Sequence, residues 1–212
     1  MAKSDKRPPG VNYFFGVRIK NKDILSNIES FQKDYISANE ELKKYIEEPS
    51  KAHITLNVLY LKEEEVEPCA NLIREKLKLS LPDEETEERR TLKIQGVDKF
   101  GSRVVWAKPV GGVEFLLKLR QELIRILLEG GFDAREVDRK FEPHVTMLKT
   151  RGYGGSRSKR KSGEEKKRQL GDDIEEYSDT LFGEDIVKEY ELLSMNKPCK
   201  DGYYHSEATF TL

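Results

Sequence analysis

The chain has 212 residues, enough for one large domain or two small lobes around a substantial core. Its 38 Lys and Arg residues nearly cancel its 39 Asp and Glu residues, which excludes a global field for binding polyanions, so any nucleic-acid affinity must come from a local patch. No apolar run approaches the roughly 18 residues of a membrane span. The polar start does not resemble a secretory signal.

The spacing of apolar residues predicts a mixed sequence of strands and helices after a disordered leader at residues 1–10. In chain order it predicts strands at 11–19, 51–60, 91–97, 103–109, 141–149, 185–195 and 203–212. It also predicts three helices: one that begins after a cap at Asn21 or Asp23, one at 63–79 and one at 113–129. Both halves run strand, helix, then a strand with a His-x-Thr triplet. This order predicts a single α+β domain over 11–212 that is two-lobed, internally duplicated and paired in antiparallel fashion.

Residues 151–169 interrupt this pattern with glycine, serine and two basic runs, and they contain little to bury. The composition predicts a flexible basic loop directly after the second His-x-Thr strand. Such a loop is a solvated insertion, a nuclear-import signal or a basic collar for a phosphate-bearing ligand. Cys69 and Cys199 lack metal-type spacing and predict reduced thiols, so we expect a cytoplasmic or nuclear protein.

The most informative motifs are the two triplets, His53-Ile54-Thr55 and His144-Val145-Thr146. Side chains alternate between the faces of a strand, so each triplet places an imidazole and a hydroxyl on one face. Ile54 with Leu56, and Val145 with Met147, are then expected to be buried on the other face. Two such strands side by side would surround a small cleft with two imidazoles and two hydroxyls.

This set of groups suits phosphodiester cleavage without a metal or another cofactor. Imidazole titrates near pH 6.5, so His53 and His144 can supply a base for the attacking hydroxyl and an acid for the leaving oxygen. Thr55 and Thr146 can donate hydrogen bonds to the phosphate oxygens. One triplet alone would be read as structural, as we read His205. A zinc site built from all three histidines is disfavoured because they lack close ligand spacing.

Aromatic and basic residues near these strands supply further candidates for a nucleotide site. Phe100, at a glycine turn, and Tyr204 are expected to stack on a base, whereas core packing is expected for most other aromatic residues. Arg103, Lys149 and Arg151 are candidate phosphate or ribose contacts or, equally, solvated charges.

The segments HITL and HVTM resemble the signature of the 2H phosphoesterases, the LigT-like superfamily. NYFFGVRI, FEPHVTMLK, FGEDIVKEYELLSM and DGYYHSEATF extend the resemblance over nearly the whole chain, to the branch found as the central domain of A-kinase anchoring proteins. The resemblance implies a bilobal fold with antiparallel sheets around a central groove and helices outside. It also implies binding of AMP-type nucleotides and a metal-independent 2′,5′-phosphodiesterase activity on oligoadenylates.

Carried over position by position, the resemblance makes His53 and His144 the acid–base pair and Thr55 and Thr146 phosphate ligands. It also makes the stretch from His144 to Met147, which includes Val145, part of the nucleotide site. The substrate is then a nucleotide, a short oligoadenylate or RNA, and the protein a monomer. A 2′,3′-cyclic phosphodiesterase, an RNA 3′-end processing enzyme and a non-catalytic AMP-sensing module are the alternatives.

The anchoring helix of that branch lies beyond the phosphoesterase domain, and this chain shows none before Leu212. Ala2 rather than glycine follows Met1, so the chain lacks the myristoylation signal. We therefore expect neither anchoring of a kinase regulatory subunit nor attachment to a membrane.

Overall fold

The computed structural model describes residues 9–38, 40–80, 86–150, 169–198 and 201–212. The strands are β1 (Tyr13–Arg18), β2 (His53–Tyr60), β3 (Thr91–Phe100), β4 (Val104–Pro109), β5 (Asp133–Arg135), β6 (Val145–Lys149), β7 (Leu181–Ile186), β8 (Glu189–Ser194) and β9 (His205–Thr211). The helices are α1 (Lys22–Ser37), α2 (Glu63–Ser80), α3 (Glu87–Arg90) and α4 (Val113–Glu129), with 3₁₀ turns η1 (Glu40–Tyr45), η2 (Pro49–Lys51) and η3 (Ile174–Tyr177).

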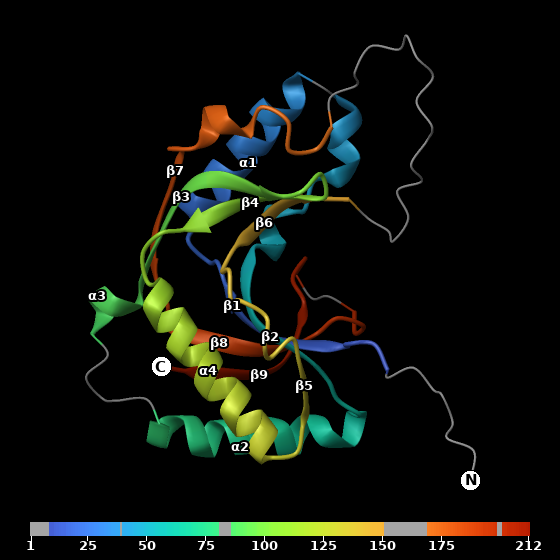
Figure 1. Cartoon of the computed structure of the whole chain (residues 1–212), viewed down its shortest axis with the longest axis vertical. Coiled ribbons are helices and arrows are strands. Elements are labelled where there is room, and N and C mark those ends of the chain that lie inside the picture. The colour runs from blue at the N-terminus through green and yellow to red at the C-terminus, as the bar shows by residue number, and fades with distance from the viewer. Residues whose placement is uncertain (1–8, 39, 81–85, 151–168, 199–200) are drawn as a thin grey trace.

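The strands form two antiparallel halves that meet at one point. Their order is β7-β3-β4-β6-β2-β1-β8-β9, and β5 pairs with β2. Strands β6 and β2 share only the pair Ile54 and Val145, so each half is a compact sheet joined to the other through the two His-x-Thr segments. The architecture confirms the predicted bilobal α+β fold with antiparallel pairing (Figure 1).

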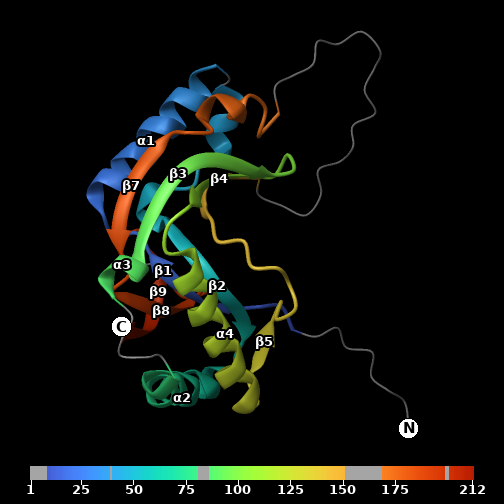
Figure 2. The same ribbon diagram turned by 60° about the vertical axis from the view of Figure 1, so that its left-hand side comes forward.

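Each half is covered by a helix that follows a strand of the other half. Helix α1 follows β1 but packs against β6 and β7, whereas α4 follows β4 but packs against β2, β5 and α2. Figure 2 shows α1 along the upper half and α2 with α4 along the lower half. This crossing ties the two halves together and fixes how their inner strands meet.

Helix boundaries follow from local chemistry. The side chain of Asn21 accepts hydrogen bonds from the backbone N–H groups of Asp23 (2.9 Å) and Ile24 (3.3 Å), so Asn21 is the cap of α1. Ile24, Ile28, Phe31 and Tyr35 are buried on one face of that helix, as their spacing predicts. Helix α4 has the predicted bounds.

Two predicted elements need correction, and one strand was not predicted. The stretch 185–195 is not one strand, because residues 187 and 188 separate β7 from β8. The second His-x-Thr strand begins at Val145 rather than at Phe141, since residues 141–144, which include Pro143, belong to no strand. Strand β5 was not predicted, and its three residues are too few for a recognisable alternation.

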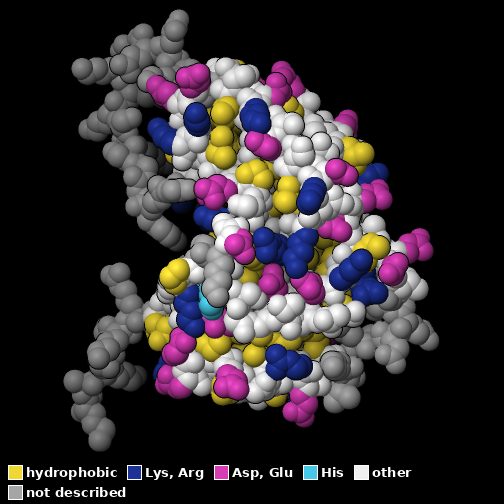
Figure 3. Space-filling model, turned by 180° about the vertical axis from the view of Figure 1, so that it is seen from behind, with side chains coloured by type: hydrophobic (Ala, Val, Ile, Leu, Met, Phe, Trp, Pro, Cys, Tyr) yellow, Lys and Arg dark blue, Asp and Glu magenta, His cyan; other side chains and the backbone are white. Residues whose placement is uncertain are grey.

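Residues 1–8 of the leader and residues 151–168 of the basic loop lie outside the described residues. Across the residues that are described, no helix combines the length and apolar character needed to cross a bilayer. Charged side chains of both signs mingle on the face opposite that in Figure 1, in keeping with the near-zero net charge (Figure 3).

Candidate active site

The junction of β2 and β6 places the two triplets side by side. Ile54 lies opposite Val145 in antiparallel register, so His53 is beside Thr146 and Thr55 is beside His144. Ile54 and Val145 are fully buried in the core, which leaves the four polar side chains on the other face of the sheet. We call this half-buried face, defined by His53, Thr55, His144 and Thr146, the catalytic face.

Both imidazoles are held by the same type of hydrogen bond to a backbone carbonyl group. Nδ1 of His53 lies 2.7 Å from the carbonyl oxygen of Lys51, and Nδ1 of His144 lies 2.8 Å from that of Glu142. A carbonyl oxygen only accepts, so Nδ1 carries the proton in each ring, and Nε2 of the neutral ring is left as an acceptor. The acceptor residue stands two positions before the histidine in each case, so the two halves repeat the arrangement.

Burial and neighbouring charges favour the neutral form of both rings. Burial lowers the pKa of His53 to about 4, and the positive charges of His144 and Lys149 contribute, against the raising effect of the Lys51 carbonyl. The pKa of His144 is also lowered, mainly by burial, while the Glu142 carbonyl and carboxylate oppose this change. Because His144 acts on the pKa of His53, the rings are electrostatically coupled. An anionic ligand between them would raise both pKa values.

Each imidazole is enclosed by an aromatic pair. The ring of His53 lies 5.0 Å from Phe14 and 5.3 Å from Tyr204, measured between centroids. The ring of His144 lies 5.0 Å from Phe100 and 5.7 Å from Trp106. These aromatic neighbours pack against the imidazoles and contribute to the burial that lowers the pKa values.

Gly16 leaves room for the first of these pairs. It lies opposite Thr55 on β1, and a Cβ atom at Gly16 would stand 3.0 Å from a ring carbon of Phe14. The absence of a side chain therefore lets the Phe14 ring lean across β1 toward His53. At the matching position beside Thr146, strand β4 carries Trp106 instead.

The predicted nucleotide contacts divide into two groups. Phe100 and Tyr204 lie against His144 and His53, where stacking on a ligand was expected. The side chains of Val145 and Met147 are fully buried in the core on the opposite face, and the contact of this segment with a nucleotide stays a prediction.

The basic candidates are also separated by the fold. The charge of Lys149 lowers the pKa of both histidines, so Lys149 lies near the catalytic face, whereas Arg103 is exposed at the β3–β4 turn. Arg151 lies outside the described residues.

His205 lies 3.8 Å from a carboxylate oxygen of Glu207 in β9. Among the described residues, no group of three or more His, Cys, Asp or Glu side chains is arranged to hold a metal ion.

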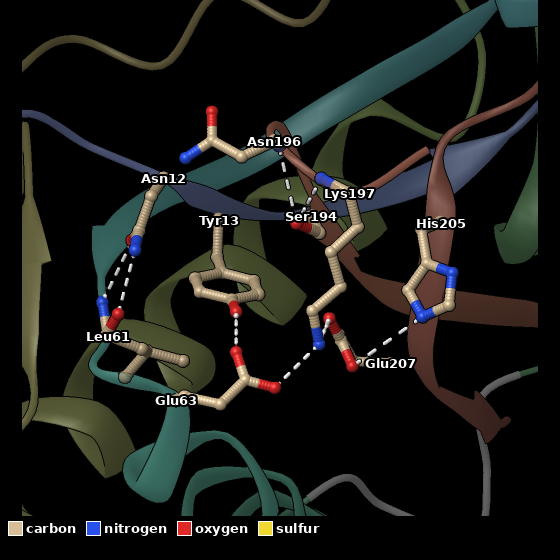
Figure 4. Close-up of polar contacts among 9 residues, drawn as sticks. All are labelled: Asn12, Tyr13, Leu61, Glu63, Ser194, Asn196, Lys197, His205 and Glu207. Carbon is tan, nitrogen blue, oxygen red and sulfur yellow. Dashed lines mark hydrogen bonds and ion pairs between the residues drawn. The ribbon is translucent and has the colours of Figure 1, made fainter. Parts of the chain in front are cut away.

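The chain that carries Tyr204 is anchored by a charged cluster at the start of the β8–β9 connection (Figure 4). Nζ of Lys197 lies 2.8 Å from Glu63 of α2 and 2.6 Å from Glu207 of β9. The hydroxyl of Tyr13 donates to Glu63 at 3.2 Å, and Ser194 accepts from the backbone N–H of Lys197. These contacts tie the start of the β8–β9 connection to helix α2 and to strands β8 and β9.

On the other side of the site, Arg120 of α4 holds the segment that leads to His144. Its Nη2 donates to the carbonyl oxygens of Glu136 (2.8 Å) and Arg139 (3.5 Å), and its guanidinium lies 5.3 Å from the centre of the Phe141 ring. Arg120 is only 8% exposed. Sequence patterns did not identify this role, because an arginine on an amphipathic helix is ordinarily solvated.

Comparison with known proteins agrees with this geometry. Residues 11–212 match the family model described as "AKAP7 2'5' RNA ligase-like domain". The chain is 32% identical over 206 residues to human A-kinase anchor protein 7 isoform gamma, covering 95% of this chain and 57% of that protein, so it spans a little over half of this relative's length.

Two solved structures show the same fold at low identity. The protein TT0787 of Thermus thermophilus is 18% identical, with a TM-score of 0.62 over 95% of this chain and 97% of that chain. E. coli LigT complexed with 3'-AMP is 17% identical, with a TM-score of 0.59 over 95% and 98%. The chain belongs to the AKAP7 2'5' RNA ligase-like domain family and has the fold of the LigT-type 2H phosphoesterases.

Proposed function

We propose that this protein is a metal-independent phosphodiesterase that cleaves 2′,5′-linked oligoadenylates and binds AMP-type nucleotides on the catalytic face. The observation that carries the proposal is the junction of β2 and β6, where Ile54 and Val145 pair and the two histidines and two threonines share one face. A phosphate placed there is offered two hydroxyl donors and two imidazole nitrogens.

The proposed mechanism uses the ring nitrogens that the backbone leaves open. Nε2 of one neutral imidazole accepts the proton of the attacking hydroxyl as the new P–O bond forms. The second ring, protonated, donates its Nε2 proton to the oxygen that leaves when the old P–O bond breaks. The hydroxyls of Thr55 and Thr146 donate to the non-bridging oxygens. Throughout, each Nδ1–H remains bonded to its carbonyl, which keeps the rings aligned.

The electrostatics favour His53 as the base and His144 as the acid. The charges that act on His53 are both positive and keep its pKa low, at about 4, so this ring is ready to accept a proton. Burial lowers the pKa of His144 as well, and the charges of Lys149 and Arg139 act in the same direction. The carboxylate of Glu142, which has no counterpart at His53, opposes them and favours the protonated form of His144 once a phosphate is bound.

Support for the substrate class comes from the relatives. The family model's description names 2'5' RNA ligase-like domains, and E. coli LigT has been crystallised with 3'-AMP and with ATP. We extend nucleotide binding from LigT to this chain on the basis of the shared fold and the aromatic pairs beside the histidines. The 2′,5′ linkage rests on the sequence resemblance.

The test is cleavage of 2′,5′-linked and 3′,5′-linked oligoadenylates in excess chelator. The proposal expects cleavage of the 2′,5′ linkage and loss of activity in His53→Asn and His144→Asn. His205→Asn, at the remaining histidine, is the matched control and should retain activity. Inertness toward both linkages, or full activity of His53→Asn, would overturn the proposal.

Product analysis separates two routes at the same site. Attack by water and attack by a neighbouring ribose hydroxyl would use the same two imidazoles, but only the second yields a cyclic phosphate. Mass spectrometry of early time points in ¹⁸O-labelled water detects that cyclic product. A stable cyclic product would change the assignment from hydrolysis to transesterification.

A further inference from the structure

Arg18 is a cation on the same side of the sheet as the catalytic face, and the proposed mechanism does not use it. Arg18 pairs with His53 in the antiparallel register of β1 and β2, so the two side chains lie on one face. Its chain neighbours Val17 and Ile19 are buried in the core on the other face. The guanidinium is therefore available to a ligand that extends past His53 toward the end of β1.

The ring of Tyr203 supports this guanidinium. Cζ of Arg18 lies 4.0 Å from the centroid of the ring, and Tyr203 is only 2% exposed. The next ring along the chain, that of Tyr204, lies 5.5 Å from the Tyr203 ring and 5.3 Å from the ring of His53. A guanidinium over an aromatic ring keeps its N–H groups around its free edge, where they can bind two oxygens of one phosphate.

Arg18 differs in its partners from the cation at the matching position of the other half. By the register of β4 and β6, Lys108 stands beside the second triplet as Arg18 stands beside the first. Nζ of Lys108 lies 3.2 Å from a carboxylate oxygen of Asp98 on β3, so its charge is neutralised. Across the described parts of the chain, by contrast, no ion pair or hydrogen bond engages the guanidinium of Arg18.

The carboxylate that could neutralise Arg18 is buried. Glu191 of β8 stands at the position that matches Asp98 of β3, since each pairs with the residue two positions before the cation. Burial, and then the negative charge of Glu191, raise the pKa of Tyr203, so this carboxylate lies near the same ring. Glu191 is only 6% exposed, whereas Arg18 is half-buried. A ligand on this face can therefore reach the guanidinium more readily than the carboxylate.

A guanidinium without an ion-pair partner at this position fits a second phosphate group of the ligand. The charge of Arg18 is not among those that shift the pKa of His53, so the guanidinium stands apart from a phosphate between the imidazoles. Lys20, the next cation along the chain, already forms an ion pair with Glu189. In an oligonucleotide every internal nucleoside carries a phosphate on each side, so the neighbour of the scissile phosphate lies one nucleoside away.

We propose that Arg18 forms a second phosphate subsite, which binds the phosphate next to the scissile one in a 2′,5′-linked oligoadenylate. This inference rests on the proposed function for the position of the scissile phosphate. It names the preferred substrates as chains in which the nucleoside beside the scissile bond carries a further phosphate rather than a free hydroxyl. The guanidinium supplies a positive charge and two N–H donors to that group.

Binding of three nucleotides that contain no diester tests the subsite without requiring turnover. Adenosine 2′,5′-bisphosphate carries the two phosphates that flank one nucleoside within a 2′,5′-linked chain, whereas AMP and adenosine 2′-monophosphate carry one each. Calorimetry with the wild-type protein should give about tenfold tighter binding of the bisphosphate than of either monophosphate, the lower end of the range for a hydrogen bond to a charged group.

Two variants at Arg18 and one matched control identify the group responsible. Arg18→Gln keeps a polar side chain, and Arg18→Met keeps an apolar stem against Tyr203. Both remove the charge and should bind the three nucleotides within about twofold of one another. Lys108→Gln removes the matching cation, which Asp98 already neutralises, so it should retain the preference for the bisphosphate. Thermal unfolding verifies that each variant is folded.

Equal binding of the bisphosphate and the monophosphates by the wild type, or a preference that survives in Arg18→Gln or Arg18→Met, overturns the subsite. Loss of the preference in Lys108→Gln overturns it as well, because net charge rather than Arg18 would then be responsible. Absence of binding for all three nucleotides has the same meaning. If the preference depends on Arg18 but no diester is cleaved, the subsite stands and the proposed phosphodiesterase activity fails. Cleavage of diesters by a protein that shows no such preference leads to the opposite conclusion.

Discussion

The stability of the protein should depend on pH through His53, and the dependence should vanish in His53→Asn. Burial lowers the pKa of His53 to about 4 in the folded state, whereas an unfolded chain has the ordinary value of about 6.5. Between these values the unfolded state binds more protons, so stability is fully present above pH 6.5 and is lost as pH falls toward 4.

The magnitude follows from the two pKa values. One pKa unit corresponds to about 1.4 kcal/mol, so protonation of the unfolded state should cost about 2 kcal/mol at pH 5 and about 3 kcal/mol below pH 4. Asparagine does not titrate, but its side-chain N–H can still donate to the Lys51 carbonyl that accepts from His53. The variant therefore removes the proton equilibrium while keeping the local hydrogen bond.

Urea unfolding of both proteins at pH 7.5 and pH 5 measures the effect. The free energy of unfolding of the wild type, relative to His53→Asn, should fall by about 2 kcal/mol between the two pH values, with unchanged m-values. A difference that is the same at both pH values would refute the reasoning, because it would mean that His53 titrates alike in the folded and unfolded states.

Three further substitutions probe the groups around the histidines. His144→Asn should lower kcat about 10² to 10⁴-fold with a smaller change in KM, since it removes one proton-transfer group; a change confined to KM would contradict this. Arg120→Met should destabilise the fold by about 1–3 kcal/mol in thermal unfolding and lower kcat, because the loop before His144 loses two hydrogen bonds; wild-type stability and kcat would contradict its positioning role. Gly16→Ala should push the Phe14 ring from His53 and raise the pKa of that histidine toward 6.5, measured by NMR titration; an unchanged pKa would show that Phe14 does not control its hydration.

Much of the fold was predictable because the apolar residues that are regularly spaced along the sequence are the ones buried in the structure. The stripe of α4 and the cap at Asn21 are local features, and the structure follows both. The division of 185–195 into β7 and β8 was missed because residues 187 and 188 lack a glycine or proline to signal the break. Strand β5 exists through its pairing with β2, which no local pattern encodes.

The catalytic face was predictable in its polar residues and not in their surroundings. Strand alternation placed each histidine with its threonine and put Ile54 in the core. The same alternation also placed Val145 and Met147 in the core, where the structure has them, and the nucleotide contacts that the resemblance implies for this segment stay a prediction. Phe14 was missed because its ring reaches His53 only across Gly16, a contact between two strands.

One phosphate should engage both imidazoles, and NMR of the histidine ring nitrogens can detect this at each ring separately. The two rings would be titrated in the free protein and with a slowly cleaved 2′,5′-linked adenylate dimer carrying a phosphorothioate. Nδ1 should keep its proton in both free rings, and the ligand should raise the pKa of His53 and of His144 together. A response at only one ring, or at neither, would contradict a shared phosphate.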